Sequence, residues 1–372
     1  MSVTSHMPCQ QCGAPVRIHA THCSHCDAPQ VGSSRPPEQW LGQTIDGKYE
    51  IVDVLGVGGM GMVFRARRVL VGDDVALKVL FPRLLRSSLQ RRLFRDEGIA
   101  AARLSHPNVV TVFDADLSGD ETAYIAMELL EGHTLKELLK NEAPVDPRRL
   151  VPIAIQICEG LAAAHDQRIV HRDLKPDNVF LEHRASGIPR VKLVDFGIAA
   201  MMDIDAADEQ QKLLGTIRYM APEQCRGDAL DGRADLYALG VVLYEGLTRR
   251  RATGKNISAV LHGEVTPPNM VLEPSKHLPL SLENLVMRLL AKHPDDRPVD
   301  ARAARDALIE IHEELTGASV PVAPTAQLPN LPAPVAAPPP APGGGRARLW
   351  LGLVLAGLAG IGVGVLLEFL RK

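Results

Sequence analysis

HRDLKPDNVF, residues 171–180, is the most informative stretch of this 372-residue chain. It holds Asp173, Lys175 and Asn178 close together. A carboxylate can accept the proton of a hydroxyl group, a lysine can neutralise phosphate charge, and an asparagine oxygen can bind Mg²⁺. The stretch therefore indicates phosphoryl transfer, which needs groups of these three kinds.

A glycine-rich turn lies upstream, in LGVGGMGMVF. Gly56, Gly58 and Gly61 separate two predicted strands, and without a Cβ they let backbone N–H groups approach a polyphosphate. A dinucleotide-binding strand–turn–helix unit is disfavoured because the following MVFRARRVL is typical of a strand. The GKN at 254–256 does not fit a P-loop, since it lacks the upstream glycine and the Ser or Thr that holds magnesium.

Three further charged residues complete the pattern. VALKVL supplies Lys78 on a predicted strand, and Glu97 in the next helical segment can pair with that lysine and hold it against phosphate oxygens. VDFG supplies Asp195, a second candidate Mg²⁺ ligand besides Asn178. Each residue alone is compatible with an ordinary surface charge, whereas their combination in this order indicates phosphoryl transfer.

With these motifs the chain resembles the eukaryotic-like Ser/Thr protein kinases of bacteria over residues 49–315. The resemblance implies an α+β, two-lobed protein kinase fold, with a strand-rich first lobe and a helical second lobe. It implies Asp173 as the catalytic base and Lys175 as a contact to the γ-phosphate. Asn178 and Asp195 are then the ligands of Mg²⁺, with Mn²⁺ as an alternative ion. The ATP-binding residues implied are Leu55, Gly56, Gly58, Gly61, Val63, Ala76, Lys78, Glu97, Met127, Glu128, Leu130 and Phe180.

The same resemblance gives finer roles. Val63, Ala76 and Phe180 would enclose the adenine ring, Met127 would be the gatekeeper, and residues 128–130 would form the hinge. In the activation segment it points to Thr216, expected to contact the catalytic Asp and Lys, and to Glu223, expected to pair with Arg297. Asp235 would support the catalytic loop from a buried helix.

Hydrophobic periodicity supports the division into two lobes. Short runs typical of strands dominate residues 49–128, interrupted by one helical pattern around residues 93–104. After residue 128 the pattern is mainly helical. Thr134 with Glu137 predicts a capping box, and Asp146 followed by Pro147 predicts the start of a helix.

Two segments depart from the usual kinase pattern. Residues 198–215 contain no Ser, Thr or Tyr, although a phosphate in such a loop commonly pairs with an arginine placed like Arg172. We hypothesise that acidic residues of the loop replace the phosphate; the alternative is a solvated loop ordered by substrate or by a partner kinase. The acidic residues are Asp203, Asp205, Asp208 and Glu209. In addition, residues 246–258, GLTRRRATGKNIS, replace the usual turn after the buried helix. The family pattern therefore does not predict the substrate-docking surface at this place.

The N-terminal segment carries four cysteines with metal-ligand spacing. The pattern C-x2-C-x10-C-x2-C predicts a zinc ribbon over residues 1–30, followed by a linker over 31–48. The alternative of two disulfides is disfavoured by the reduced cytoplasm, where we expect this chain. Nucleic acid is not an expected partner, because the net charge is −3 and residues 1–35 hold few fixed positive charges. The predicted zinc ligands are Cys9, Cys12, Cys23 and Cys26.

The C-terminal part predicts a membrane anchor. A Pro/Ala/Gly-rich linker over 316–348 precedes residues 349–367, which carry no charge and would form a helix of ~28 Å, close to the thickness of a bilayer core. Gly360 and Gly364 form a small-xxx-small pair on which a homodimer could form. The N-terminus shows no secretory signal. We therefore expect a single-pass protein of the cell membrane with its large domain in the cytoplasm.

Taken together, the sequence predicts an active Ser/Thr protein kinase, an ATP:protein phosphotransferase that autophosphorylates and serves membrane-linked signalling. Its partners would be protein substrates, ATP, Mg²⁺ and structural Zn²⁺. The alternative from another class is a pseudokinase scaffold that binds nucleotide or partner proteins. Loss of Lys78, Asp173 or Asp195 would indicate that alternative, and all three are present.

Overall fold

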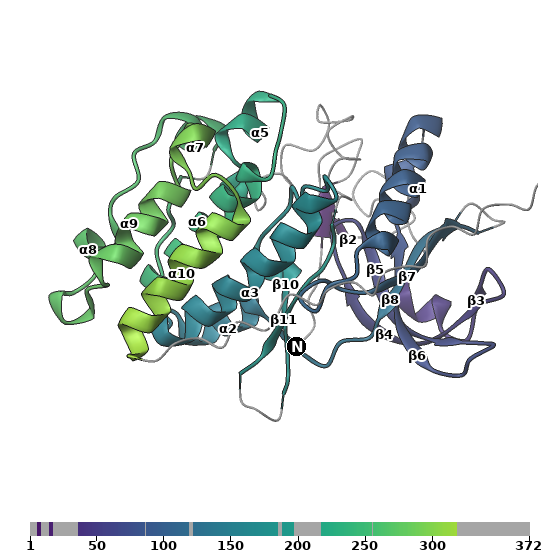
Figure 1. Cartoon of the computed structure of the whole chain (residues 1–372). Coiled ribbons are helices and arrows are strands. Elements are labelled where there is room, and N and C mark those ends of the chain that lie inside the picture. The colour runs from purple at the N-terminus through teal and green to yellow at the C-terminus, as the bar shows by residue number, and fades with distance from the viewer. Residues whose placement is uncertain are drawn as a thin grey trace, which may run out of the picture. The chain divides into compact units, whose positions relative to one another are not determined.

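The structure is a computed structural model that describes residues 6–8, 15–17, 36–85, 87–118, 122–184, 188–196, 217–254 and 256–317. The side chains of residues 6–8, 15–17, 83, 97 and 100 are outside this description. Figure 1 shows a group of strands with helix α1, and a separate group made mainly of helices. The predicted two-lobed α+β fold is confirmed.

The first lobe is a six-stranded antiparallel sheet in the order β3-β4-β5-β6-β8-β7. Its central strand β6 is buried on both faces: Val75, Leu77 and Val79 pack into one apolar cluster, whereas Ala76 and Leu80 pack into another. Side chains of a strand alternate between faces, so one strand can contribute to two cores. The strands are β3 (Thr44–Ile45), β4 (Tyr49–Val57), β5 (Gly61–Arg68), β6 (Asp74–Leu80), β7 (Val112–Leu117) and β8 (Ala123–Glu128).

Helix α1 (Ser88–Arg103) covers the second face of this sheet. It begins before the apolar pattern at residues 93–104, because Ser87 and Gln90 form a capping box that starts the helix. Leu89 in the first turn is 51% exposed, so the beginning of the helix has no apolar periodicity. Gly98 allows close packing: a Cβ there would lie 2.7 Å from the Cβ of Ala115 on β7.

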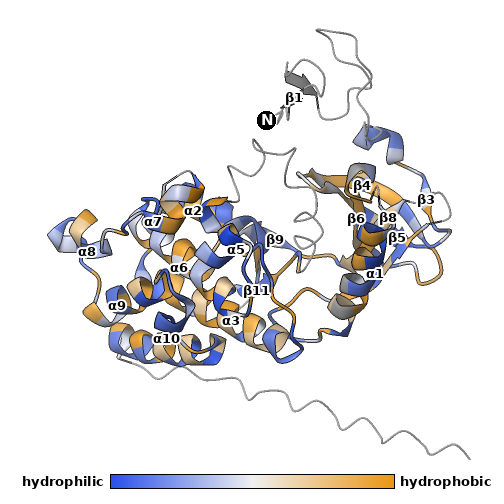
Figure 2. Ribbon diagram, turned by 90° about the horizontal axis from the view of Figure 1, so that it is seen from above, coloured by the Kyte–Doolittle hydropathy of each residue, from blue (hydrophilic) through white to orange (hydrophobic). Residues whose placement is uncertain are grey.

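The second lobe is built around helix α6 (Arg233–Thr248), in which nearly every residue is buried. Figure 2 shows hydrophobic residues running along α6. The capping box of Thr134 and Glu137 and the N-cap Asp146 are both present, as predicted. The other helices are α2 (Leu135–Glu142), α3 (Pro147–Asp166), α5 (Pro222–Arg226), α7 (Ile257–His262), α8 (Pro268–Val271), α9 (Leu280–Leu289) and α10 (Ala301–Thr316).

A three-stranded sheet, β11-β10-β9, lies in the helical lobe, where it positions the catalytic segments. Its strands are β9 (Gly132–Thr134), β10 (Val179–Glu182) and β11 (Arg190–Leu193). The link between the lobes runs through β11: Leu193 forms a bridge with Val109, which lies just before β7. The motif stretches 171–180 and 194–196 therefore lie at the same end of the antiparallel pair β10–β11, where Val179 is opposite Leu193.

The two predicted appendages fall mostly outside the description. Near the N-terminus, β1 (His6–Pro8) pairs with β2 (Pro15–Arg17) in antiparallel register. Residues 318–372 lie outside the described residues, and so do all four cysteines of the predicted ribbon. In the part that is described, no helix has both the length and the apolar character needed to cross a bilayer.

Candidate active site

The catalytic loop is held by one buried carboxylate. Asp235 on α6 is 1% exposed and accepts hydrogen bonds from the backbone N–H of His171 (2.8 Å) and of Arg172 (2.9 Å). The imidazole Nε2 of His165 lies 2.8 Å from the same carboxylate. Arg172 has φ +64°, a conformation that costs free energy in a residue with a Cβ. The hydrogen bonds to Asp235 stabilise this backbone and so fix the next residue, Asp173.

Asp173 presents one occupied and one free carboxylate oxygen. Its Oδ2 lies 2.6 Å from the Nζ of Lys175 and accepts a hydrogen bond of 3.1 Å from the Nδ2 of Asn178. The same Nδ2 donates to the backbone carbonyl of Asp173 at 2.8 Å. Its Oδ1 is buried and accepts no hydrogen bond from any described residue. Three residues of the sequence motif are thus brought into direct contact, with one acceptor oxygen available.

Asp195 follows β11 and is paired with the predicted lysine. Its Oδ1 lies 2.7 Å from the Nζ of Lys78, which is 6% exposed, and its backbone has φ +64°. Burial acts to raise the pKa of Asp195, but the positive charge and hydrogen bond of Lys78, with smaller contributions from His171 and Lys175, hold that pKa below its usual value. Asp195 is therefore a carboxylate at neutral pH. Its interaction with Lys175 also links it to the group around Asp173.

His171 is a site residue that the sequence reasoning missed. Its ring is fully buried, and its Nε2 donates to the backbone carbonyl of Val194 at 3.1 Å. The ring also packs on Phe196, with 4.5 Å between ring centroids. His171 therefore joins the catalytic loop to the segment that carries Asp195. No spacing signal identified it, because its partners Val194 and Phe196 lie more than twenty residues further along the chain.

The strand register aligns the predicted nucleotide-binding residues. Gly56 is opposite Val63, and Val63 is opposite Lys78. Ala76 is opposite Met127 on β8. Because directly opposite residues share a face, these side chains point to one side of the sheet.

The other predicted ATP-binding residues are placed individually. Leu55 on β4 is 49% exposed, whereas Leu130, after β8, and Phe180, on β10, are partly buried. Glu97 lies on α1, but its side chain is outside the description, so its pairing with Lys78 stays a prediction.

The glycine-rich turn between β4 and β5 is open where a polyphosphate would approach. Nothing lies within 4 Å of the position that a Cβ would take at Gly56 or Gly59. Gly61 is required for a different reason: its Cβ would lie 2.2 Å from the carbonyl oxygen of Val79 on β6. The N–H of Gly58 donates to the carbonyl of Gly61 at 2.8 Å and closes the turn. The room at 56 and 59 fits a polyphosphate, but the glycine at 61 serves strand packing.

Oxygen donors that suit Mg²⁺ are also present. Asp195 supplies a carboxylate, and Asn178 supplies an amide oxygen that accepts no hydrogen bond from the described residues while its nitrogen donates to Asp173. Mg²⁺ prefers such oxygens and usually keeps several waters and phosphate oxygens besides one or two protein ligands. The described residues contain no cluster of three or more His, Cys, Asp or Glu arranged around a metal position. The pair Asn178 and Asp195 fits a magnesium ion that is bound together with phosphate.

An ion pair connects the hinge to β11. Glu128 lies at the end of β8, and its Oε1 is 2.6 Å from the Nζ of Lys192, which is 5% exposed. The same oxygen accepts the N–H of Thr111 at 2.7 Å, and Lys192 also donates to the carbonyl of Val109 at 3.3 Å. The side chain of Glu128 thus ties the end of β8 to Thr111 and to β11, and its role in the hinge stays a prediction. Lys192 is a second residue that the sequence reasoning missed.

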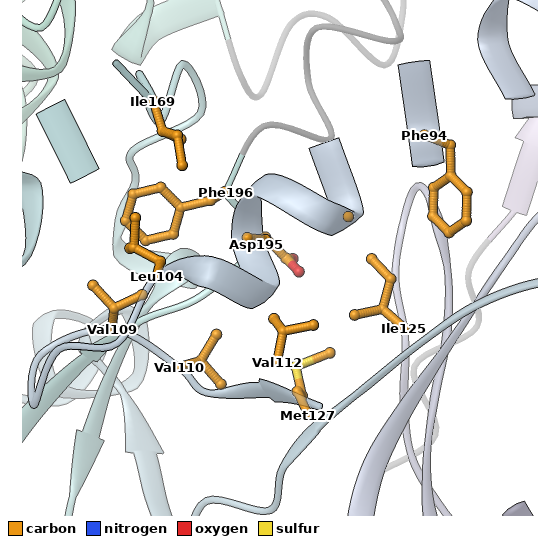
Figure 3. Close-up of a pocket in the computed structure, with 12 residues that line it drawn as sticks. Phe94, Leu104, Val109, Val110, Val112, Ile125, Met127, Ile169, Asp195 and Phe196 are labelled. Atoms are coloured by element: carbon orange, nitrogen blue, oxygen red, sulfur yellow. The ribbon is translucent and has the colours of Figure 1, made fainter. Parts of the chain in front are cut away.

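An apolar pocket lies between α1 and the segment of Asp195 (Figure 3). Among the described residues that line it, Asp195 alone is charged. In Figure 3 its carboxylate points into the space between Phe196 and Ile125. Met127 on β8 also lines the pocket, and its role as gatekeeper stays a prediction. The low polarity of this wall strengthens the interaction between Lys78 and Asp195.

The end of the activation segment is fixed by a buried ion pair. Glu223 on α5 accepts two hydrogen bonds from Arg297, at 2.6 and 2.8 Å, and both side chains are almost fully buried. This is the pairing that the resemblance implied. Gln224 donates to the backbone carbonyl of Arg172 at 2.8 Å and so ties α5 to the catalytic loop. Thr216 and the acidic loop residues lie outside the described residues.

The chain matches the family model described as "Protein kinase domain" over residues 49–308. It is 38% identical over 287 residues to "Serine/threonine-protein kinase pkn3" of Myxococcus xanthus, which covers 74% of this chain and 52% of that protein. It is 36% identical over 279 residues to "Serine/threonine-protein kinase PrkC" of Bacillus subtilis, which covers 72% of this chain and 42% of that protein. The chain thus spans about half the length of the curated relatives it matches.

Among solved structures, the chain is similar to the PknI kinase domain of Mycobacterium tuberculosis, in its C20A mutant. The TM-score is 0.59 and the sequence identity 28%, and the match covers 73% of this chain and 97% of that domain.

Proposed function

The chain belongs to the protein kinase family, alongside bacterial Ser/Thr kinases, and on that premise we propose that it transfers the γ-phosphate of Mg-ATP to Ser and Thr hydroxyls of proteins. The observation that carries this proposal is the buried Oδ1 of Asp173, which accepts no hydrogen bond from the described residues. A buried acceptor without a partner is costly, and a substrate hydroxyl is the donor that would satisfy it.

The proposed roles follow from the contacts. Asp173 accepts the hydroxyl proton at Oδ1, while Lys175 and the amide of Asn178 hold its other oxygen. Asn178 and Asp195 would hold Mg²⁺, which when bound neutralises phosphate charge. Lys78, whose ammonium group already reaches Asp195, would contact phosphate oxygens.

The test is transfer of phosphate from Mg-ATP to a protein substrate, followed by identification of the modified residues. The intact chain is expected to yield phosphoserine and phosphothreonine, and Asp195→Asn is expected to lower the rate at least about a hundredfold. Equal, near-zero rates for both proteins would favour the pseudokinase alternative. Autophosphorylation belongs to the proposal, and the same reaction without substrate tests it by mapping phosphate on the chain, with Thr216 as a candidate.

We propose that the N-terminal segment is a zinc ribbon. Cys9 and Cys12 lie in sequence between the paired strands β1 and β2, as in a hairpin that presents two ligands at its turn. Cys158 is fully buried, which raises the pKa of its thiol, and burial raises the pKa of Cys225 to about 11. Both should therefore react slowly with thiol reagents at neutral pH.

Zinc content and thiol reactivity test this proposal. The purified chain is expected to hold about one zinc ion, and a chelator should release it and expose about four fast-reacting thiols. Cys9→Ser should weaken zinc retention, whereas Cys225→Ser should leave it unchanged. Rapid reaction of all the ribbon cysteines before chelation would contradict the proposal.

We propose further that residues 349–367 anchor the chain in the cell membrane, with the kinase domain on the cytoplasmic side. The support is the uncharged run in the sequence, beyond a linker rich in proline. In cell fractionation the chain should stay with membranes through a carbonate wash, and a variant ending at Gly317 should be released. Retention of the shortened chain would contradict the anchor. Cross-linking of a Gly360→Leu, Gly364→Leu variant tests a dimer through this helix.

A further inference from the structure

Three consecutive arginines follow the end of α6. Arg249, Arg250 and Arg251 are all exposed, and none forms an ion pair with another described residue. They replace the turn that usually follows this helix in kinases, and nothing in the proposed reaction uses them. A group of unpaired guanidinium groups on one short segment is a recognition site for anions.

The backbone of this segment is held firmly in place. Arg249 ends α6 in a left-handed conformation with φ +57°, and its N–H donates to the carbonyl of Glu245 at 2.8 Å. The N–H of Arg250 donates to the Oγ1 of Thr248 at 3.0 Å. Ala252 and Thr253, which follow, are buried. The arginine side chains are therefore displayed from a fixed turn, so a bound anion need not order the loop.

Contacts place this turn beside the end of the activation segment. The hydroxyl of Thr253 lies 3.5 Å from the carbonyl oxygen of Arg218, two residues after Thr216. Arg249 lies one helical turn beyond Glu245, whose carboxylate accepts the hydroxyl of Tyr219 at 2.8 Å. Arg249 is the left-handed residue that ends α6, so the arginine turn begins one turn beyond the contact between Glu245 and Tyr219. In a protein kinase the substrate is positioned by this part of the activation segment and by the loop of Asp173.

A neighbouring arginine adds to the positive charge. The Nε of Arg218 is buried and has no hydrogen-bond partner among the described residues. Glu245 is already engaged by Tyr219. Glu245 keeps its negative charge in this contact, but among the described residues neither it nor any other carboxylate forms an ion pair with the three arginines.

We propose that Arg249, Arg250 and Arg251 bind acidic residues that flank the phosphoacceptor, so that the preferred substrates of this chain are acidic protein segments. The inference rests on the proposed kinase function. Charge complementarity selects this occupant, because three exposed guanidinium groups beside the end of the activation segment attract the carboxylates of a bound peptide.

The experiment compares two peptides with the same Ser or Thr and the same length. One carries Asp and Glu around the phosphoacceptor and the other carries Asn and Gln at the same positions. The intact chain is expected to show a KM about tenfold lower for the acidic peptide. Arg249→Gln, Arg250→Gln and Arg251→Gln together should remove this difference while leaving the rate on the neutral peptide unchanged. The preference should also shrink as salt is added.

A control variant carries the same change in charge elsewhere on the helical lobe, at the exposed residues Lys140, Lys276 and Arg288, each replaced by Gln. It is expected to keep the preference. No phosphate on either peptide would contradict the kinase function itself. Equal KM values for the two peptides with the intact chain would overturn the docking proposal alone. So would a triple arginine variant that keeps its preference but binds phosphatidylserine vesicles less tightly, since the turn would then serve a membrane surface.

Discussion

Asp173→Asn is expected to lower the rate of phosphate transfer by about 10²–10⁴-fold while leaving ATP affinity and folding nearly unchanged. The amide has the shape of the carboxylate and can still accept a hydrogen bond, but it cannot take up the hydroxyl proton. The contacts of Oδ2 with Lys175 and Asn178 hold the side chain in place, and Oδ1 is the oxygen left for the substrate. Three measurements check this prediction. The transfer rate is measured with saturating Mg-ATP, the nucleotide affinity by calorimetry, and the folding stability by the melting temperature.

The matched control is Asp177→Asn on the same loop. Asp177 forms a surface ion pair with Lys136, and both side chains are substantially exposed. Exposed pairs of this kind contribute little, so the variant should keep a rate within a few-fold of the intact chain. If Asp173→Asn retained activity similar to that of Asp177→Asn, Asp173 would not be the base.

The elements of this fold that the sequence predicted are those with a local cause. The strands β4, β5, β6 and β8 appear as short apolar runs, and the caps at Thr134 and Asp146 are formed by residues two or three positions apart. The start of α1 was not predicted, because Ser87 and Gln90 cap a first turn that is exposed and has no apolar pattern. Strand β3, with only two residues, also gives no periodic signal.

In the active site, too, the sequence predicted the residues whose contacts are local. Asp173, Lys175 and Asn178 are recognisable because they lie in one short motif and also contact one another. His171 and Lys192 act through partners far along the chain: Val194 and Phe196 for the first, Glu128 for the second. In the sequence, Lys192 is indistinguishable from any other charged residue of a strand such as RVKL. Its partner Glu128 is determined by the way the two lobes contact each other. Such long-range pairs need coordinates.

The pair of Glu223 and Arg297 is an intermediate case, predicted from the resemblance and invisible in spacing. Arg297 is 3% exposed and donates to both carboxylate oxygens of Glu223. It also donates to the carbonyls of Ala291 (2.9 Å) and Arg233 (2.8 Å), and its guanidinium lies over the ring of Tyr237 at 5.1 Å. One side chain thus connects α5, α6 and the turn before α10.

Arg297→Met is therefore expected to destabilise the kinase domain by about 3–5 kcal/mol. Methionine fills much of the space but leaves the carboxylate of Glu223 buried without a partner, and the backbone carbonyls of Ala291, Arg233 and Lys292 lose a donor. For a domain of this size the melting temperature should fall by roughly 10 °C, as scanning calorimetry would show. Arg297→Lys keeps the charge but not the fork of two N–H groups. Its melting temperature should lie between those of the intact chain and of Arg297→Met.

The control for this loss is Arg302→Met, which breaks the ion pair between Arg302 and Asp166 near the surface, where the two side chains are 48% and 54% exposed. Screening by water makes that pair weak, so stability should change by less than about 1 kcal/mol. Replacing Glu223 and Arg297 together by Met should recover part of the loss, because no buried charge then remains unpaired. The recovery should be incomplete, since the carbonyls of Ala291 and Arg233 still lack donors. If Arg297→Met and Arg302→Met destabilised the domain equally, burial would not explain the contribution of the Glu223–Arg297 ion pair to stability.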